Sequence, residues 1–113
     1  MSWRLFLDDV RNVDWVYPDA KDGDYIVCRS YHEAVEMCQE RGCPSFVSFD
    51  HDLGEASPTG LDFANWLVIQ DVESGFMPAD FRWHVHSANP WGAANIEARM
   101  KGYFTYRNKD RSP

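Results

Sequence analysis

Short apolar runs, each closed by polar residues, recur along the chain and predict the strands of a sheet. They cover residues 4–10, 25–29, 45–50 and 82–87. The first run is apolar at successive positions, which is typical of a parallel strand buried on both faces. Residues 12–24 lack a sustained helical period and contain Pro and Gly, so we expect them to be mostly loop.

A helix should follow the second run, because its start and end are both signalled. Ser30 and Glu33 form an S-x-x-E capping box at the predicted start. Gly42 and then Pro44 predict the end, since glycine closes helices and proline cannot continue them.

Two further helices are predicted from proline signals in the sequence. Ser57-Pro58 suggests a capping residue followed by a first-turn proline, and apolar residues at helical spacing continue to Gly75. Asn89-Pro90 suggests the same start for the last helix.

Strands that alternate with helices predict one α/β domain built on a doubly wound parallel sheet. Such strands pair in parallel through right-handed crossovers, with helices on both faces of the sheet. We expect four strands, a single domain over residues 1–106, and a frayed polar tail over residues 107–113.

Acidic and histidine side chains gather where three of the predicted strands end. The carboxyl ends of neighbouring parallel strands meet at one crevice, where open α/β sheets bind ligands. Carboxylates packed together raise each other's pKa unless a cation holds them. The residues are Asp8-Asp9, Asp50-His51-Asp52 and His86-Ser87.

The donor atoms in this set favour a hard divalent cation. Oxygen ligands with few sulfur or imidazole donors suit Mg²⁺ or Mn²⁺ better than zinc, and we expect Asp8, Asp9 and Asp50 to be the ligands. A single aspartate is more simply explained as the cap of a turn or helix. The whole set is not.

The proton-handling residues remain open between several roles. Asp50 and Asp52 share a face of extended chain, so one can bind a metal or attack phosphorus while the other handles a proton. His51 is a second candidate for proton transfer. His86 is either a general acid or a packed residue, whereas His84 fits a core position.

Candidate phosphate ligands flank the same strand ends. Arg11 can clamp a phosphate or pair with an aspartate, and both interpretations stand. Ser87, Asn89 and the first amides of the last helix make an anion cradle, because a helix N-terminus presents free N–H groups. Trp91 either stacks on a base or packs against the fold.

Composition narrows the class of partner. A net charge of −7, with no stripe of Lys or Arg, disfavours long duplex nucleic acid. No apolar segment is long enough for a bilayer and no export signal opens the chain, so we expect a cytoplasmic protein without a membrane partner. Cys28, Cys38 and Cys43 form no CxxC pair, which favours reduced, buried thiols.

The chain resembles the response-regulator receiver fold at the ends of three predicted strands. The matching residues are the acidic pair Asp8-Asp9, then Asp50, and then Ser87-Ala88. The resemblance implies a flavodoxin-like strand order of 2-1-3-4, with Asp8 and Asp9 binding Mg²⁺. It also implies that Asp50 accepts a phosphoryl group that the Ser87 hydroxyl contacts. A receiver's fifth strand and its lysine are missing here.

Three ordered motifs are closer to a divergent group, the cyclic-phosphate processing receiver domains. They are L-F-L-D-D-V-R at residues 5–11, S-F-D-H-D-L-G at 48–54 and V-H-S-A-N-P-W-G-A at 85–93. The resemblance implies action on a cyclic phosphate, with the additional His and Asp residues replacing the phosphorelay machinery.

The leading hypothesis is a metal-dependent phosphoesterase that opens a cyclic phosphate on a small nucleotide or an RNA end. Asp50, His51, Asp52 and His86 would carry the chemistry. One alternative is a receiver-like module that binds a nucleotide, metal or protein without turnover. Another is a phosphoryl-accepting receiver in which Arg11 replaces the lysine.

Overall fold

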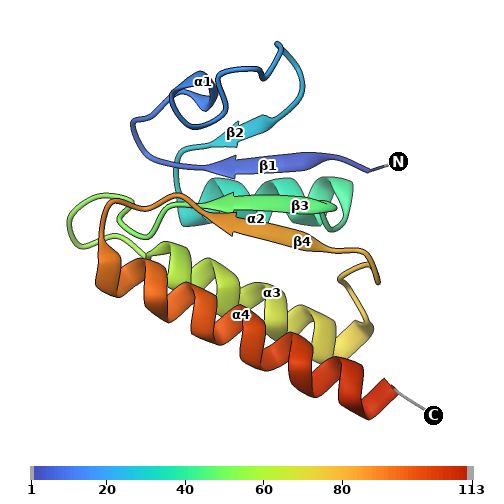
Figure 1. Cartoon of the computed structure of the whole chain (residues 1–113). Coiled ribbons are helices and arrows are strands. Elements are labelled where there is room, and N and C mark those ends of the chain that lie inside the picture. Colours follow the sequence, from blue (N-terminus) through green and yellow to red (C-terminus); the bar gives the residue numbers. More distant parts are fainter. Residues whose placement is uncertain (1, 112–113) are drawn as a thin grey trace.

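The computed structural model describes residues 2–111 and contains a parallel four-stranded sheet with helices (Figure 1). The strand order is β2-β1-β3-β4, and every neighbouring pair is parallel, as predicted. The strands end before the polar residues that were expected within them. The elements are β1 (Arg4–Leu7), α1 (Val13–Val16), β2 (Ile26–Cys28), α2 (Tyr31–Arg41), β3 (Phe46–Phe49), α3 (Gly60–Ser74), β4 (Arg82–Val85) and α4 (Pro90–Arg111).

The register of the sheet brings the polar strand ends into one row. Leu7 lies opposite Phe49, and Phe49 lies opposite Val85. The backbone pairing continues for one more residue, because Asp50 N donates to the Leu7 carbonyl and His86 N donates to the Phe49 carbonyl. The residues that follow the three strands are therefore neighbours at the carboxyl edge.

The helices lie very unequally on the two faces of the sheet. Leu5, Val47 and their same-face neighbours pack with α2, α3 and α4 in the main core. Phe6 points to the opposite face, where Tyr17 and Tyr25 contact its ring edge-on. Within residues 2–111, this second face has only the one-turn helix α1 and the loop after it, which matches the predicted loop over residues 12–24.

Two of the three predicted helix starts are confirmed. Ser30 Oγ accepts a hydrogen bond from Glu33 N at the start of α2. The reciprocal bond of the capping box is shifted by one residue, because the Glu33 carboxylate accepts from Arg29 N at 3.4 Å. Pro90 is the first residue of α4, and Asn89 precedes it as predicted.

The predicted start of α3 is wrong by two residues. The capping residue is Thr59 rather than Ser57, and the helix begins at Gly60. Thr59 Oγ1 accepts from Asp62 N, while the Asp62 carboxylate accepts from Thr59 N at 2.7 Å. This reciprocal pair satisfies two N–H groups at once. With Ser57 as the cap, the third helical residue would be Gly60, which has no side chain to accept from the N–H group of the cap.

The predicted polar tail is wrong as far as Arg111, because α4 continues to that residue. Arg107 is 5% exposed, and its Nη1 lies 3.5 Å from Asp71 Oδ2. Its Nη2 donates to the Met77 carbonyl. The buried Asp71 carboxylate needs a cation, and Arg107 supplies it from the last turns of the helix. Residues 112–113 lie outside the described chain.

The long helices are amphipathic rather than apolar all round. α3 buries Phe63, Leu67 and Val68 but exposes Ile69 and Val72 to solvent. Within residues 2–111, no helix combines the length and the apolarity that crossing a membrane requires.

The cysteines occupy the sites expected of small apolar residues. Cys28 and Cys38 are buried, Cys43 is partly buried, and all three are free thiols. Burial raises the pKa of Cys28 and of Cys43 to about 12, and it raises the pKa of Cys38 further.

The native thiols should therefore resist iodoacetamide at about pH 8, whereas the unfolded chain should react at all three. Mass spectrometry counts the alkylated residues. Because these pKa values lie above the unfolded value of 9.0, the unfolded chain loses protons first as the pH rises. The free energy of unfolding should accordingly fall above about pH 9. Rapid labelling of the native protein would contradict this assignment.

Replacing the buried cation should destabilise the fold. We expect Arg107→Met to lower the free energy of unfolding by about 3 kcal/mol, because Asp71 stays buried without its partner. Urea denaturation measures the change. Lys109→Met, at an exposed position in the same helix, should change stability by less than about 0.5 kcal/mol. Equal losses for the two variants would show that the ion pair does not anchor α4.

Candidate functional site

The candidate site is a cluster of three carboxylates at the carboxyl edge of the sheet. One oxygen from each of Asp8, Asp9 and Asp50 lies within 4.8 Å of the others. Asp8 is fully buried and Asp50 is 4% exposed, whereas Asp9 is partly exposed. These are the three ligands predicted from the sequence, and their oxygen donors fit a hard ion such as Mg²⁺ or Mn²⁺. Asp52 is not part of the cluster.

Asp8 is held by four hydrogen bonds. Its Oδ1 accepts from the backbone N–H groups of Val10 and Arg11, at 2.9 and 2.8 Å. Its Oδ2 accepts from Arg11 Nη1 and from His86 Nε2, both at 2.9 Å. Burial pushes the pKa of Asp8 upward, but these hydrogen bonds outweigh burial and hold the pKa below its usual value. Asp8 is therefore the fixed, ionised member of the cluster.

Asp50 is shifted in the opposite direction. Burial and the charge of Asp8 raise its pKa, and the hydrogen bonds from Ser87 and from His51 N only partly offset them. A second buried carboxylate beside an ionised one resists ionisation unless positive charge is near. A nearby cation would therefore stabilise the ionised forms of Asp8 and Asp50 together.

Arg11 is the cation that the chain itself supplies. Its Nη1 lies 2.9 Å from Asp8 Oδ2 and 3.6 Å from Asp50 Oδ2, and the side chain is 27% exposed. The sequence left open whether Arg11 pairs with an aspartate, and the structure shows that it does. Nε and Nη2 make no hydrogen bond within residues 2–111, so these N–H groups remain available to an anion.

Arg29 stabilises the loop that carries the cluster, and the sequence analysis missed it. Its Nη1 donates to the carbonyls of Asp8 and Arg11, at 3.1 and 2.6 Å. The available signal was its place at the end of the second predicted strand, one residue after Cys28, which pairs with Leu7.

His86 does not lie where a proton donor to substrate would be needed. Its side chain is 2% exposed, and its ring stacks on Phe6 with centroids 4.7 Å apart. Nε2 contacts Asp8, and Nδ1 contacts Ser48 Oγ at 2.7 Å. Burial lowers the pKa of His86, which favours the neutral ring. The geometry therefore makes His86 a partner of Asp8 rather than a direct acid.

His51 and Asp52 form the exposed pair of the site. His51 Nδ1 lies 2.9 Å from Asp52 Oδ1, and the His51 side chain is 17% exposed. Hydrogen bonds from His51 and then Asn89 lower the pKa of Asp52, which is solvent-exposed. His51 Nε2 has no hydrogen-bond partner within residues 2–111.

Glycines allow this edge to pack closely. A Cβ on Gly92 would lie 2.3 Å from the His51 ring, so the first turn of α4 accommodates the imidazole only without a side chain there. A Cβ on Gly60 would lie 1.8 Å from the Asp50 carbonyl oxygen. The start of α4 thus packs closely against His51, and the start of α3 packs closely against Asp50.

The predicted anion cradle at the start of α4 is wrong. Asn89 Oδ1 already accepts from Trp91 N and Gly92 N, both at 3.1 Å, and Pro90 has no N–H group. Ser87 Oγ accepts from Asn89 N. An asparagine cap satisfies the first-turn amides internally, so few remain for a phosphate.

Trp91 does not pack against the fold, because 81% of it is exposed. That finding excludes one of the two roles that the sequence allowed. Whether the indole stacks on a base stays a prediction.

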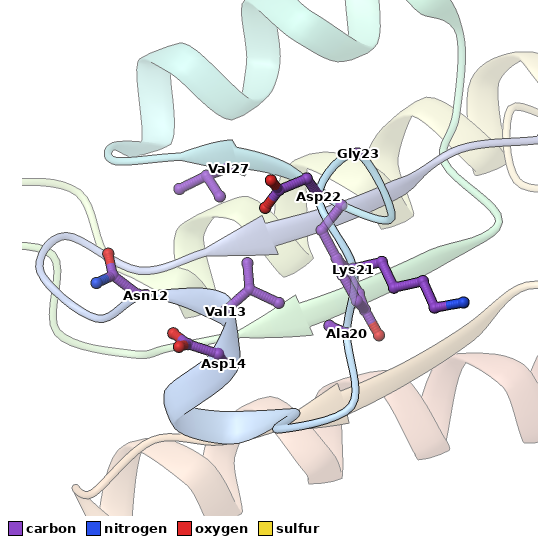
Figure 2. Close-up of a pocket in the computed structure, with 9 residues that line it drawn as sticks. Asn12, Val13, Asp14, Ala20, Lys21, Asp22, Gly23 and Val27 are labelled. Carbon is purple, nitrogen blue, oxygen red and sulfur yellow. The ribbon is translucent and has the colours of Figure 1, made fainter.

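A cavity lies between α1 with the loop that follows it and β2, and not on the carboxylate cluster. It measures about 450 Å³ and is lined by residues 12–14 and 20–23 together with Tyr25 and Val27. Figure 2 shows Asn12 and Asp14 on one side of it and Asp22 and Val27 on the other. None of the predicted catalytic or metal-binding residues lines this cavity.

Comparisons with known proteins place the chain in a family. No curated protein matches it. Among solved structures it is similar to the adenylate cyclase from Rhodopirellula baltica, with 16% identity, a TM-score of 0.45, and coverage of 97% of this chain and 96% of that chain. A likeness of that degree carries no inference about activity. The model of the Cyclic-phosphate processing Receiver domain matches residues 3–102, which include the four strands and the carboxylate cluster. The chain therefore belongs to the family of cyclic-phosphate processing receiver domains.

Proposed function

We propose that this protein is a metal-dependent phosphoesterase that opens the cyclic phosphate of a nucleotide or of an RNA end. The observation that carries the proposal is the cluster of Asp8, Asp9 and Asp50, whose oxygens lie within 4.8 Å of one another. Bound to these residues, Mg²⁺ or Mn²⁺ would polarise a phosphoryl oxygen and lower the pKa of a bound water.

Arg11 is the residue best suited to hold the substrate phosphate. Its engaged Nη1 neutralises Asp8, while its remaining N–H groups are free to donate to phosphate oxygens. A guanidinium presents these donors in a planar fork that matches a phosphate. One such arginine on a chain of net charge −7 suits a small substrate or a strand end rather than a duplex.

His51 is the residue best suited to move protons. In the reaction, a water oxygen forms the new P–O bond, one ester P–O bond of the ring breaks, and the product is a phosphomonoester. Asp52 orients the ring through Nδ1, which leaves Nε2 to take the proton of the water and return a proton to the leaving sugar oxygen. This division of work follows the logic by which a carboxylate fixes the tautomer of a catalytic histidine.

A binding module without turnover is the second candidate, and one observation favours it. Arg11 already compensates the charge of Asp8 and Asp50, so the site is neutralised in part without any ligand. Such a module would bind a nucleotide, a metal or a protein and would not need the free nitrogen of His51.

Turnover of 2′,3′-cyclic nucleotides and of RNA with a cyclic-phosphate end tests the proposal. We expect activity with Mg²⁺ or Mn²⁺, its loss in EDTA, and a fall of at least about 100-fold in Asp50→Asn and in His51→Ala. Asp80→Asn, at an exposed aspartate outside the cluster, is the matched control and should retain full activity.

Four results would decide against the enzyme. Turnover absent under all metal conditions, or unchanged in Asp50→Asn, would contradict the proposal. Nucleotide binding without turnover would establish the module, and stable labelling of Asp50 by acetyl phosphate would indicate a phosphoryl-accepting receiver.

Gly92→Ala should reduce turnover by displacing the His51 ring, to a degree similar to His51→Ala. Gly102→Ala is the matched control, because it lies in the same helix with open space around its Cβ. It should keep activity and add up to about 1 kcal/mol of stability, since alanine favours a helix over glycine. Full activity in Gly92→Ala would show that the position of His51 is not needed.

A further inference from the structure

We propose that Tyr17 and Ser48 are positioning residues that fix the tautomer of His86 and thereby hold Asp8 in the orientation that binds a divalent cation. Three hydrogen bonds of 2.7, 2.7 and 2.9 Å join Tyr17 Oη to Ser48 Oγ, Ser48 Oγ to His86 Nδ1, and His86 Nε2 to Asp8 Oδ2. The part that concerns the cation rests on the proposed function. The part that concerns the tautomer does not.

The direction of each hydrogen bond follows from the last member of the chain. An ionised Asp8 can only accept, so His86 Nε2 carries a proton and donates it. A neutral imidazole then accepts at Nδ1, and the donor must be the single hydroxyl proton of Ser48. Ser48 Oγ in turn accepts from Tyr17. Asp8 thus fixes the proton on Nε2, and the Tyr17 hydroxyl, by donating to Ser48 Oγ, leaves Nδ1 as the acceptor for the Ser48 proton.

Packing fixes this chain of groups as firmly as hydrogen bonding does. Ser48 is fully buried, and the His86 ring stacks on Phe6 with an interplanar angle of 3°. Tyr17 stacks on Tyr25 at 5.3 Å. All these residues lie on the second face of the sheet, where the loop after α1 replaces a long helix. Tyr17, the residue after α1, therefore places its hydroxyl group against Ser48 on this face.

The consequence for Asp8 is that only one of its contacts can be exchanged. A carboxylate has about four acceptor positions, and Asp8 uses them for two backbone N–H groups, Arg11 Nη1 and His86 Nε2. The backbone contacts belong to a tight turn, and His86 is 2% exposed. Arg11 is 27% exposed, so its position is the one that a cation takes.

Nitrogen NMR of His86 in protein with ¹⁵N-labelled histidine tests the tautomer. In the wild-type protein, Nε2 should give the signal of a protonated nitrogen and Nδ1 that of an acceptor. In Tyr17→Phe and in Ser48→Ala, the Nδ1 signal should shift, because Nδ1 loses its fixed donor, whereas Nε2 should stay protonated through its contact with Asp8. Tyr25→Phe is the matched control, since its hydroxyl makes no hydrogen bond within residues 2–111 while its ring stacks in the same place.

The affinity for Mn²⁺ alone, measured by calorimetry without substrate, tests the link to the cluster. We expect a loss of about threefold to tenfold in Tyr17→Phe, comparable to one neutral hydrogen bond. His86→Ala, which removes the direct partner of Asp8, should lose about 10-fold to 100-fold. Tyr25→Phe should bind as the wild type does.

The outcomes separate this inference from the proposed function. Unchanged His86 signals in both Tyr17→Phe and Ser48→Ala would overturn the inference. Altered signals with unchanged Mn²⁺ affinity would overturn its second half. A wild-type protein that binds no Mn²⁺ would instead contradict the metal site, and the NMR result would still decide the tautomer. Circular dichroism of each variant confirms that it is folded.

Discussion

Mutual repulsion among Asp8, Asp9 and Asp50 is the constraint on which the site depends. Carboxylates within 4.8 Å of one another, two of them buried, need positive charge and hydrogen-bond donors to remain together. Arg11 supplies the charge, and its partial exposure allows that charge to be exchanged. The opposite pKa shifts of Asp8 and Asp50 have the same origin, because Asp8 has most of the donors.

Two histidines contact this cluster from different sides, His86 through its ring at Asp8 and His51 through its backbone N–H at Asp50. From the second face of the sheet, His86 supports Asp8 while buried and stacked on Phe6. From the side of α4, His51 lies against Gly92 and pairs with the exposed Asp52. His86 therefore contacts a carboxylate of the cluster through one nitrogen and Ser48 through the other, whereas the His51 ring hydrogen-bonds only with the exposed Asp52 within residues 2–111. The two histidines differ in their hydrogen-bond partners as well as in burial.

The sequence predicted the cluster because backbone topology alone determines it: residues that follow neighbouring parallel strands meet at one edge. The strand order is as predicted, and the clustering of Asp8, Asp9 and Asp50 follows from that rule. The features that the sequence did not predict depend on side-chain contacts between distant segments. Arg107 is buried because it compensates the charge of the buried Asp71 carboxylate, which no local pattern signals. The burial of His86 also depends on distant contacts, so the sequence could not predict it. The same is true of the hydrogen bonds by which Asn89 caps the first amides of α4.

X-ray diffraction from crystals containing Mn²⁺, recorded where manganese scatters anomalously, shows whether the carboxylate cluster binds a cation. We expect one anomalous peak within coordination distance of Asp8, Asp9 and Asp50, with the Arg11 side chain moved away from Asp8. No peak at this edge, with Arg11 still paired to Asp8 at a saturating concentration of Mn²⁺, would contradict it. In that case the arginine is the permanent counter-ion of the cluster and the site is not a metal centre.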